Sequence, residues 1–229
     1  GLDVGTAAVP KYQDWVYHIQ LAPSKAGKFS FFGMGGKSNI DFIGQEIDTT
    51  DFYSRKDQDS YFSNRLLMFG AKHSIDLGKK TYWRTVVSYS NTKSDFETYQ
   101  YALPVPPYGT AWKVTDVLDQ QDVIRFSSLL NSKTSVKFSW RAGLTGESFG
   151  LDTRVTDRQG QNSTAPFNLV RDFDDRFLLL QLFGQFRYKP SSKLTLIGGV
   201  HGMNFSFNQS SIIEPRASVQ YQANPKNSF

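Results

Sequence analysis

The amino-acid sequence predicts an all-β protein, an antiparallel transmembrane β-barrel or a part of one. Three features predict this fold class: side chains alternate in polarity with a period of two, strand-like segments are long, and short connections alternate with long ones. The 229 residues include 19 Phe and 11 Tyr, yet the mean hydropathy is −0.43. A chain rich in aromatic rings but polar on average fits a soluble β-sandwich or a membrane barrel with a polar lumen.

The alternation is clearest in three segments, 136–144, 180–188 and 217–223. In each, one face carries mainly aromatic and aliphatic side chains, whereas the other carries mainly Arg, Lys, Gln and Ser. Because successive side chains of a strand point to opposite faces, each segment has one apolar and one polar face. We expect three arginines on the polar faces to face the lumen: Arg141, Arg187 and Arg216.

The length of the strand-like segments favours the membrane barrel. They run roughly over 28–43, 61–77, 81–98, 134–150, 174–189 and 193–208. Strands in soluble proteins have about 5–6 residues, and a tilted strand crosses a bilayer with about 9–11. We therefore expect strands that project beyond the membrane. No apolar run approaches the roughly 18 residues of a transmembrane helix.

The connections alternate strictly in length along much of the chain. Short ones occur at 23–27, 78–80, 131–133, 190–193 and 224–227, and long polar ones at 45–60, 91–121 and 150–172, with a brief last one at 209–211. Short turns on the periplasmic rim and long loops on the extracellular rim are typical of outer-membrane barrels. The count is about nine strands and the start of a tenth, whereas bacterial single-chain barrels have even numbers.

Several classes of function are not expected from this sequence. There is no Cys, which excludes disulfides, thiolate metal sites and cysteine nucleophiles. The formal charge of +5 comes from scattered residues with no basic run longer than two, so nucleic acid is not an expected partner. His18, His73 and His201 lie in separate segments, so we expect no metal site and no cofactor. No catalytic arrangement of side chains stands out, and we expect no enzyme.

Two local features invite a functional interpretation. Gly33-Met34-Gly35-Gly36 has the look of a phosphate-binding loop, but no Lys-Ser or Lys-Thr follows, and we favour small residues where side chains crowd. The connection 91–121 combines a Pro-rich stretch with four rings that are candidates for ligand contact: Tyr99, Tyr101, Tyr108 and Trp112. The alternative is that these rings pack on neighbouring loops. Other aromatic residues are candidates for the interfacial girdles: Trp15, Trp83, Trp140, Tyr188 and Tyr221.

The two ends of the chain carry a resemblance to a known family. Residues 213–229 contain an E-P-R strand followed by an N-P turn into the next strand, which resembles a mid-barrel hairpin of TonB-dependent receptors. Asn39-Ile40-Asp41-Phe42 and the segment 4–12 resemble parts of the same family, in the branch with a carboxypeptidase-like regulatory N-terminal domain. The resemblance extends over the chain at the level of strand order.

The resemblance implies energy-coupled import of a scarce nutrient across the bacterial outer membrane. Such receptors hold a plug domain inside a 22-stranded barrel, so residues 1–229 would be a single, incomplete barrel segment without plug or TonB box. The implied partners are the bilayer, lipopolysaccharide, the TonB energising complex through regions absent here, and a surface lipoprotein lid or barrel-assembly machinery. The ligand class, whether siderophore, glycan, peptide or cobalamin, is left open.

Two alternatives remain at this point. A complete small barrel acting as a passive pore or adhesion scaffold requires the segments 12–20 and 217–223 to pair with each other. A soluble β-sandwich binding module requires Trp140 and Phe186 to point into a closed core.

Overall fold

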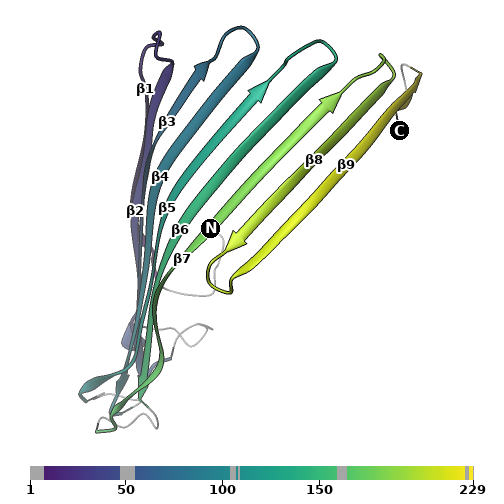
Figure 1. Ribbon diagram of the computed structural model, residues 1–229. Helices are drawn as coiled ribbons and strands as arrows, with labels where there is room; N and C mark the ends of the chain where they lie inside the picture. Colours follow the sequence, from purple (N-terminus) through teal and green to yellow (C-terminus); the bar gives the residue numbers. More distant parts are fainter. Residues whose placement is uncertain are drawn as a thin grey trace.

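The computed structural model describes residues 8–46, 55–103, 107, 109–158, 164–224 and 227–228, and these form one antiparallel sheet (Figure 1). Its ten strands are β1 (Lys11–Gln20), β2 (Lys28–Phe42), β3 (Gln58–Asp76), β4 (Thr81–Tyr101), β5 (Ala111–Ser132), β6 (Phe138–Arg158), β7 (Phe167–Tyr188), β8 (Leu194–Phe205), β9 (Ser210–Asn224) and β10 (Asn227–Ser228). A short 3-10 helix, η1 (Gly44–Glu46), follows β2. No helix in these ranges is long and apolar enough to cross a membrane.

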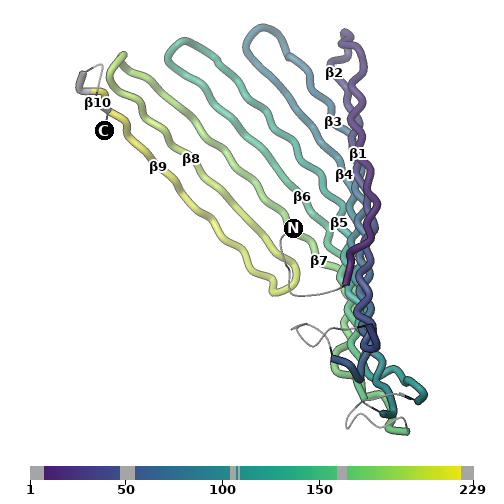
Figure 2. The backbone as a smooth tube through the Cα atoms, turned by 180° about the vertical axis from the view of Figure 1, so that it is seen from behind, coloured from purple at the N-terminus to yellow at the C-terminus, as the bar shows by residue number. Residues whose placement is uncertain are grey.

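The strands follow one another in the sheet in chain order, each paired with the next. The connections β1–β2, β3–β4, β5–β6 and β7–β8 lie together at one end of the sheet, as Figures 1 and 2 show. The ends of β2–β7 that lead to the longer connections project to the other end. This confirms the predicted sorting of connections by length.

The strands are longer than the sequence predicts at the end with the long connections. β4 continues to Tyr101 and β5 begins at Ala111, so most of the expected loop 91–121 is strand. The expected loop 150–172 likewise shrinks, because β6 runs to Arg158 and β7 starts at Phe167. The two predicted loop lengths were wrong. The strand ends are polar on at least one face and therefore resemble loops in sequence, but their backbones are still paired by the hydrogen bonds of the sheet.

Each strand has two faces that the register fixes across the whole sheet. Trp15, Trp83 and Trp140 lie on one of them, which we call the outer face. The paired row Trp140–Phe186–Gly198–Ala217 shows its apolar character. All five candidate girdle residues lie on this face, and the three candidate arginines lie on the opposite one, which we call the inner face.

The apolar outer face has no cover. Within the described residues only Val114 and Phe177 are buried hydrophobic side chains, whereas Phe186 is 44% and Leu182 52% exposed. A soluble sandwich would bury these apolar side chains in a core, so that alternative is wrong. Exposed apolar side chains over many strands are what a bilayer-facing wall requires.

The two outermost long strands, β1 and β9, do not pair with each other. Within the described residues β1 pairs only with β2, and β9 pairs with β8 and the two-residue β10. The pairing between segments 12–20 and 217–223 that a small closed barrel requires is therefore not present.

Small residues let large rings lie flat across the sheet. Gly33 pairs with Tyr17 and Gly35 with Trp15, and a Cβ at either glycine would overlap the partner's ring. The two rings stack side by side, with centroids 5.8 Å apart. The Gly-rich stretch thus serves ring packing, as the crowding interpretation predicted.

Candidate ligand-binding surface

The inner face changes character along the strands. In the part that lies behind the apolar outer band it is polar over β4–β9, with Arg84, Arg125, Arg141, Gln185 and Arg216, whereas β2 places Phe32 and Met34 there. Nearer the long connections, the same face carries aromatic side chains instead. The outer face changes in the opposite sense, from apolar to charged. This double reversal marks the level at which the strands leave the membrane.

Three phenylalanines form the first part of the aromatic surface. Phe62 pairs with Phe96 across β3 and β4, and their rings stack with centroids 4.3 Å apart. Phe42 on β2 meets Phe62 edge-on at 5.8 Å. The row continues across β5 and β6 through Val117 and Val155. Side chains on one face of paired strands are in contact distance, so the register itself builds this surface.

A second group of rings surrounds Phe177 on β7. Phe173 stacks along the same strand at 5.9 Å, and Phe205 meets Phe177 edge-on at 6.2 Å. Phe207, in the β8–β9 turn, lies 4.6 Å from Phe177 and is 59% exposed. Phe177 is buried beneath the other rings, whereas the Phe207 ring is the part of this group that is exposed for contact with a ligand. We call both groups together the distal aromatic surface.

Behind the membrane band, the inner face carries a polar chain across β7, β8 and β9. The carboxylate of Glu214 accepts a hydrogen bond from Arg216 at 2.8 Å and lies 3.1 Å from His201 Nδ1. The other ring nitrogen of His201 is 3.3 Å from Gln181 Oε1. Cross-strand hydrogen bonds of this kind fix the orientation of polar side chains on the inner face.

The candidate arginines lie around this chain. Arg141 Nε donates to Gln185 Oε1 at 2.7 Å, and its guanidinium lies 5.9 Å from the ring centroid of Phe183. Arg141 and Arg216 border one depression of about 480 Å³. Arg187 lies nearer the short turns, in a separate hollow with Lys137. The three arginines share one face, as predicted, and the lumen-facing role remains a proposal.

The three described aromatic candidates of the expected loop do not form one cluster. Tyr99 and Tyr101 lie in β4 on the outer face, whereas Trp112 in β5 pairs with Gln100 on the inner face. Tyr101 donates to Asp59 at 2.6 Å and Tyr99 to Glu97 at 3.1 Å. Tyr108 lies outside the described residues.

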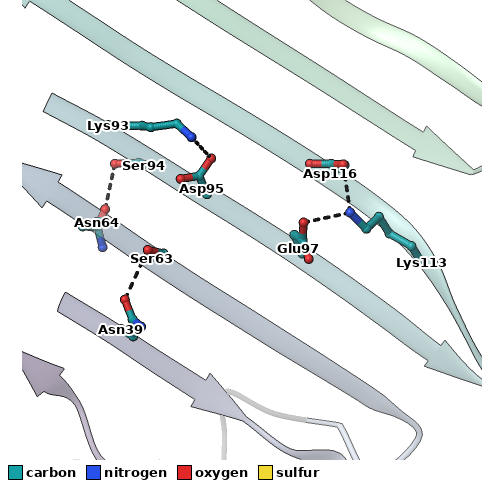
Figure 3. A network of polar contacts seen from close by, with 9 residues as sticks. All are labelled: Asn39, Ser63, Asn64, Lys93, Ser94, Asp95, Glu97, Lys113 and Asp116. Atoms are coloured by element: carbon teal, nitrogen blue, oxygen red, sulfur yellow. Dashed lines mark hydrogen bonds and ion pairs between the residues drawn. The ribbon is translucent and has the colours of Figure 1, made fainter. Parts of the chain in front are cut away.

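The ends of β2–β5 that lead to the long connections carry a network of charged, hydroxyl and amide side chains (Figure 3). Lys113 donates to Glu97 at 2.8 Å and to Asp116 at 3.0 Å. Burial alone would lower the pKa of Lys113, but these two carboxylates raise it overall. Burial and the charge of Glu97 raise the pKa of Tyr99. The network thus keeps Lys113 charged and Tyr99 neutral at physiological pH.

Among the described residues no group of three or more His, Asp or Glu side chains gathers as metal ligands would. The Nε2 atom of His73 lies 2.7 Å from the carbonyl oxygen of Ala26 in the β1–β2 turn.

Sequence reasoning missed the distal aromatic surface, although a signal was present. In 28–42 and 58–76 the apolar outward residues have odd numbers within the membrane band, such as Phe31 and Phe69. Beyond it the phenylalanines shift to even numbers, as Phe42 and Phe62 show and as Phe96 on the next strand repeats. Such a switch of parity indicates a strand that leaves the bilayer with its aromatic face turned inward.

The long tilted strands, the exposed apolar band and the polar opposite face define the wall of an outer-membrane β-barrel. The model of the family described as "TonB dependent receptor-like, beta-barrel" matches residues 13–229, and the chain belongs to this family. Membership implies energy-coupled transport at the bacterial outer membrane, without enzymatic activity.

Other comparisons add little. No curated protein sequence matches this chain. Among solved structures, the translocator domain of the autotransporter NalP from Neisseria meningitidis is similar at 11% identity and a TM-score of 0.40, over 97% of this chain and 72% of that chain. A likeness at this level supports no inference about function.

Proposed function

We propose that this chain forms part of the wall of a receptor that imports a scarce nutrient through the outer membrane by coupling to an inner-membrane energising complex. Further strands would pair with the open sides of β1 and β9, and a plug domain would contact the polar inner face. The observation that supports the proposal is the double reversal of polarity, from which we infer that the distal aromatic surface would lie at the extracellular entrance of a polar lumen.

The side chains of the inner face suggest how a ligand would be handled. Exposed rings such as Phe207 and Phe62 provide contact area for apolar, aromatic or sugar rings. Deeper in, Arg141 donates a hydrogen bond to the neutral Gln185 and forms no ion pair with any described residue, so its charge is available to an anionic group. A ligand with a ring system and a negative charge fits this order of contacts.

Among the loop candidates, Trp112 is the one that we propose for ligand contact. It lies on the inner face beside Gln100, and the indole N–H of Trp112 and the side-chain oxygen of Gln100 are buried with no hydrogen-bond partner among the described residues. The hydroxyls of Tyr99 and Tyr101 are instead taken up by carboxylates on the outer face. For these two tyrosines we propose a supporting role in holding the strand ends. A surface lipoprotein lid above this end, or barrel-assembly machinery at the open edges, are further proposed partners.

A transport assay with the full receptor tests the proposal. In the parent bacterium, a panel of sole nutrient sources should reveal one whose uptake is lost on deleting the receptor and on collapsing the proton-motive force. Replacing Phe62 and Phe96 together by Ala should reduce that uptake about tenfold, because hot-spot rings dominate binding. Uptake that persists without the energising complex would show a passive pore.

The matched control replaces Phe31 and Phe69 by Ala. Phe69 shares β3 with Phe62 and Phe31 lies on the neighbouring β2, and both rings are on the outer face within the membrane band. Uptake should be unchanged in this variant. An equal loss in both variants would mean that ring removal acts through stability, and the distal aromatic surface would have no part in ligand capture.

A further inference from the structure

The first half of β7 has a neighbouring strand on one side only. β6 pairs with β7 from Phe167 to Tyr188, whereas β8 pairs with it only from Leu179 to Tyr188. The β8–β9 hairpin turns back well before the ends of β6 and β7, as Figures 1 and 2 show. The pairing with β6 is irregular next to Arg171. A regular stretch with one open side therefore remains over 171–177, which we call the β7 edge.

Part of the backbone of the β7 edge points away from β6. The next residue shows the direction, because the C=O of Leu178 accepts from the N–H of Ser206 at 2.9 Å and its own N–H donates to Ser206 Oγ at 2.7 Å. Every second residue of a strand directs its N–H and C=O to the same side. At Arg176 the outward N–H is taken up by the carboxylate of the preceding residue, at 2.7 Å. The outward N–H and C=O groups of Asp172 and Asp174 pair with no described strand.

An edge of this kind is a template for a further strand. Natural edge strands are commonly protected by Pro, Lys or β-bulges, and 171–177 contains neither Pro nor Lys. Its side chains are exposed up to Arg176, apart from the half-buried Phe173. An added strand is held by main-chain hydrogen bonds, and alternate side chains set the preference for its sequence. The β7 edge therefore fits an extended polypeptide that lies along 171–177.

The outer face of the β7 edge favours a positively charged partner. Asp174 lies directly opposite Asp152 on β6, and neither carboxylate forms an ion pair with a described residue. Like charges directly opposite each other destabilise a sheet. Asp172 has only a distant cation, with Arg154 Nε at 4.0 Å. A Lys or Arg side chain beside Asp174 on an added strand would neutralise these carboxylates, whereas an acidic strand would be repelled.

The inner face of the β7 edge favours an apolar or aromatic side chain. Phe173 borders a hollow of about 800 Å³, together with polar residues of neighbouring strands such as Thr92 and Gln121. At the other end of the edge, the exposed ring of Phe207 lies against Phe177. Side chains opposite each other on one face of paired strands are in contact distance. A strand with basic residues outward and apolar residues inward therefore complements both faces of the β7 edge.

We propose that the β7 edge binds an extended peptide as an added strand, with a Lys or Arg side chain beside Asp174 and an aromatic or apolar side chain on Phe173. The inference rests on the proposed function and names a peptide as the imported nutrient. Main-chain hydrogen bonds to Asp172 and Asp174 hold the peptide backbone whatever its sequence, and the two faces of the edge set the preference. An aromatic side chain and the C-terminal carboxylate of a peptide also supply the ring and the negative charge that fit the inner face.

Peptide binding to the purified full receptor tests the site without requiring transport. The probe is a short peptide of alternating Lys and Phe, and the readouts are titration calorimetry and hydrogen exchange at the backbone amides of Asp172 and Asp174. Both amides should exchange rapidly in the free receptor and slowly when the peptide is bound. Slow exchange without peptide would show that another part of the receptor already pairs with the β7 edge, and would overturn the proposal.

Two N-methylated forms of the peptide separate strand addition from adhesion of a cationic chain. Methyl groups on one alternate set of backbone nitrogens remove the donors that face β7 and should abolish binding. Methyl groups on the other set face away from β7 and should leave binding intact. Equal binding of the two forms would contradict strand addition. The peptide with Glu in place of Lys should not bind, and binding as tight as that of the Lys form would refute the role of Asp174.

Variants of the receptor locate the site at Asp174. Asp174→Asn should weaken binding of the peptide about fivefold, which is the effect of one exposed ion pair. Asp174→Pro should weaken it by about a further fivefold, because Pro also removes the N–H that faces the added strand while the pairing with β6 is kept. The matched control Asp76→Asn removes a negative charge next to the short β3–β4 turn and should bind as the wild type does. An equal loss in this control would assign the effect to net charge and refute the site.

The proposed function and this site fail in different ways. Energised uptake of the nutrient that is unaffected by Asp174→Pro would leave import standing and overturn peptide capture at the β7 edge. Peptide binding at the edge without energised uptake of any nutrient would support the site and refute the proposed function. The melting temperature of Asp174→Pro should stay near that of the wild type, and the N-methylated peptides test the same hydrogen bonds on the unchanged receptor.

Discussion

At the scale of single residues, Gly150 has a role that its surroundings define. It lies in register between Asp122 on β5 and Arg176 on β7. The Arg176 guanidinium reaches over it to both carboxylate oxygens of Asp122, at 3.0 and 2.8 Å. A Cβ at this position would overlap both groups. Gly150 thus allows an ion pair between strands that are not neighbours.

We predict that Gly150→Ala separates this ion pair and lowers the thermal stability of the full receptor. The pair is partly exposed, so the loss should be modest, on the order of 1 kcal/mol or less. The effect should largely vanish when Arg176→Ala is already present, because the two changes remove the same contact. The melting temperature, determined from the change in gel mobility that unfolding on heating produces, measures this loss of stability.

The matched control is Gly184→Ala on the outer face of β7, where an added Cβ meets nothing within 4 Å. Its melting temperature should equal that of the wild type. If Gly150→Ala also left the melting temperature unchanged, the proposed bridge over β6 would contribute nothing to stability.

At the scale of elements, the projecting ends of β3 and β4 are held by tyrosines and carboxylates. Tyr61 and Tyr99 meet edge-on at 5.8 Å, and Tyr61 lies beside Asp59. Burial, followed by the charge of Asp59, raises the pKa of Tyr61 to about 12. These positions lie beyond the membrane band, so the cluster is exposed to the external pH.

We predict that the β3–β4 end loses stability at alkaline pH. An unfolded tyrosine ionises near 10, whereas folded Tyr61 keeps its proton up to about 12. Because the unfolded state releases its proton first, the stability from neutral Tyr61 is complete below pH 10 and falls between pH 10 and 12.

Alkaline unfolding of the full receptor and of Tyr61→Phe measures this contribution. The variant should lose less stability over the same pH range. The difference in tyrosinate absorbance between wild type and variant, which reports Tyr61 alone, should rise near pH 12. In denaturant the same difference should appear near the ordinary value of about 10. A rise near 10 in the folded receptor would contradict the packing described for Tyr61.

The sequence predicts these strands correctly where apolar residues alternate with polar ones and so distinguish the two faces. Within the membrane band, Trp140, Phe186 and Tyr221 define the outer face, and the predicted strands and faces are confirmed there. Beyond the band the outward side chains are polar, as at Lys93 and Asp95, so strand ends looked like loops. The faces of Tyr99 and Trp112 also depend on an irregularity in register next to Tyr99, which no local pattern reveals.

At the scale of the whole molecule, the sheet is a wall with two reversals of polarity. The outer face passes from an apolar band to charged groups such as Lys37 and Asp95, and the inner face passes from arginines to phenylalanines. One sheet thereby presents an apolar band, a charged margin on the same face, and an opposite face that is polar behind the band and aromatic at its margin. The order of strands and the sorting of connections by length could be predicted, since both follow from the linear order of segments. The distal aromatic surface could not be predicted as simply, because its aromatic residues come from five strands and a turn.

The most direct test of the central claim is the oxygen accessibility of nitroxide labels placed one at a time along β6 of the full receptor in bilayers. Labels at Trp140, Ala142 and Leu144 should collide frequently with oxygen dissolved in lipid, and labels at Arg141 and Thr145 should not. Beyond Gly150 the outward positions should become accessible to a polar nickel chelate. Accessibility that failed to alternate, or that favoured Arg141 and Thr145, would contradict the assignment of the outer face to the membrane.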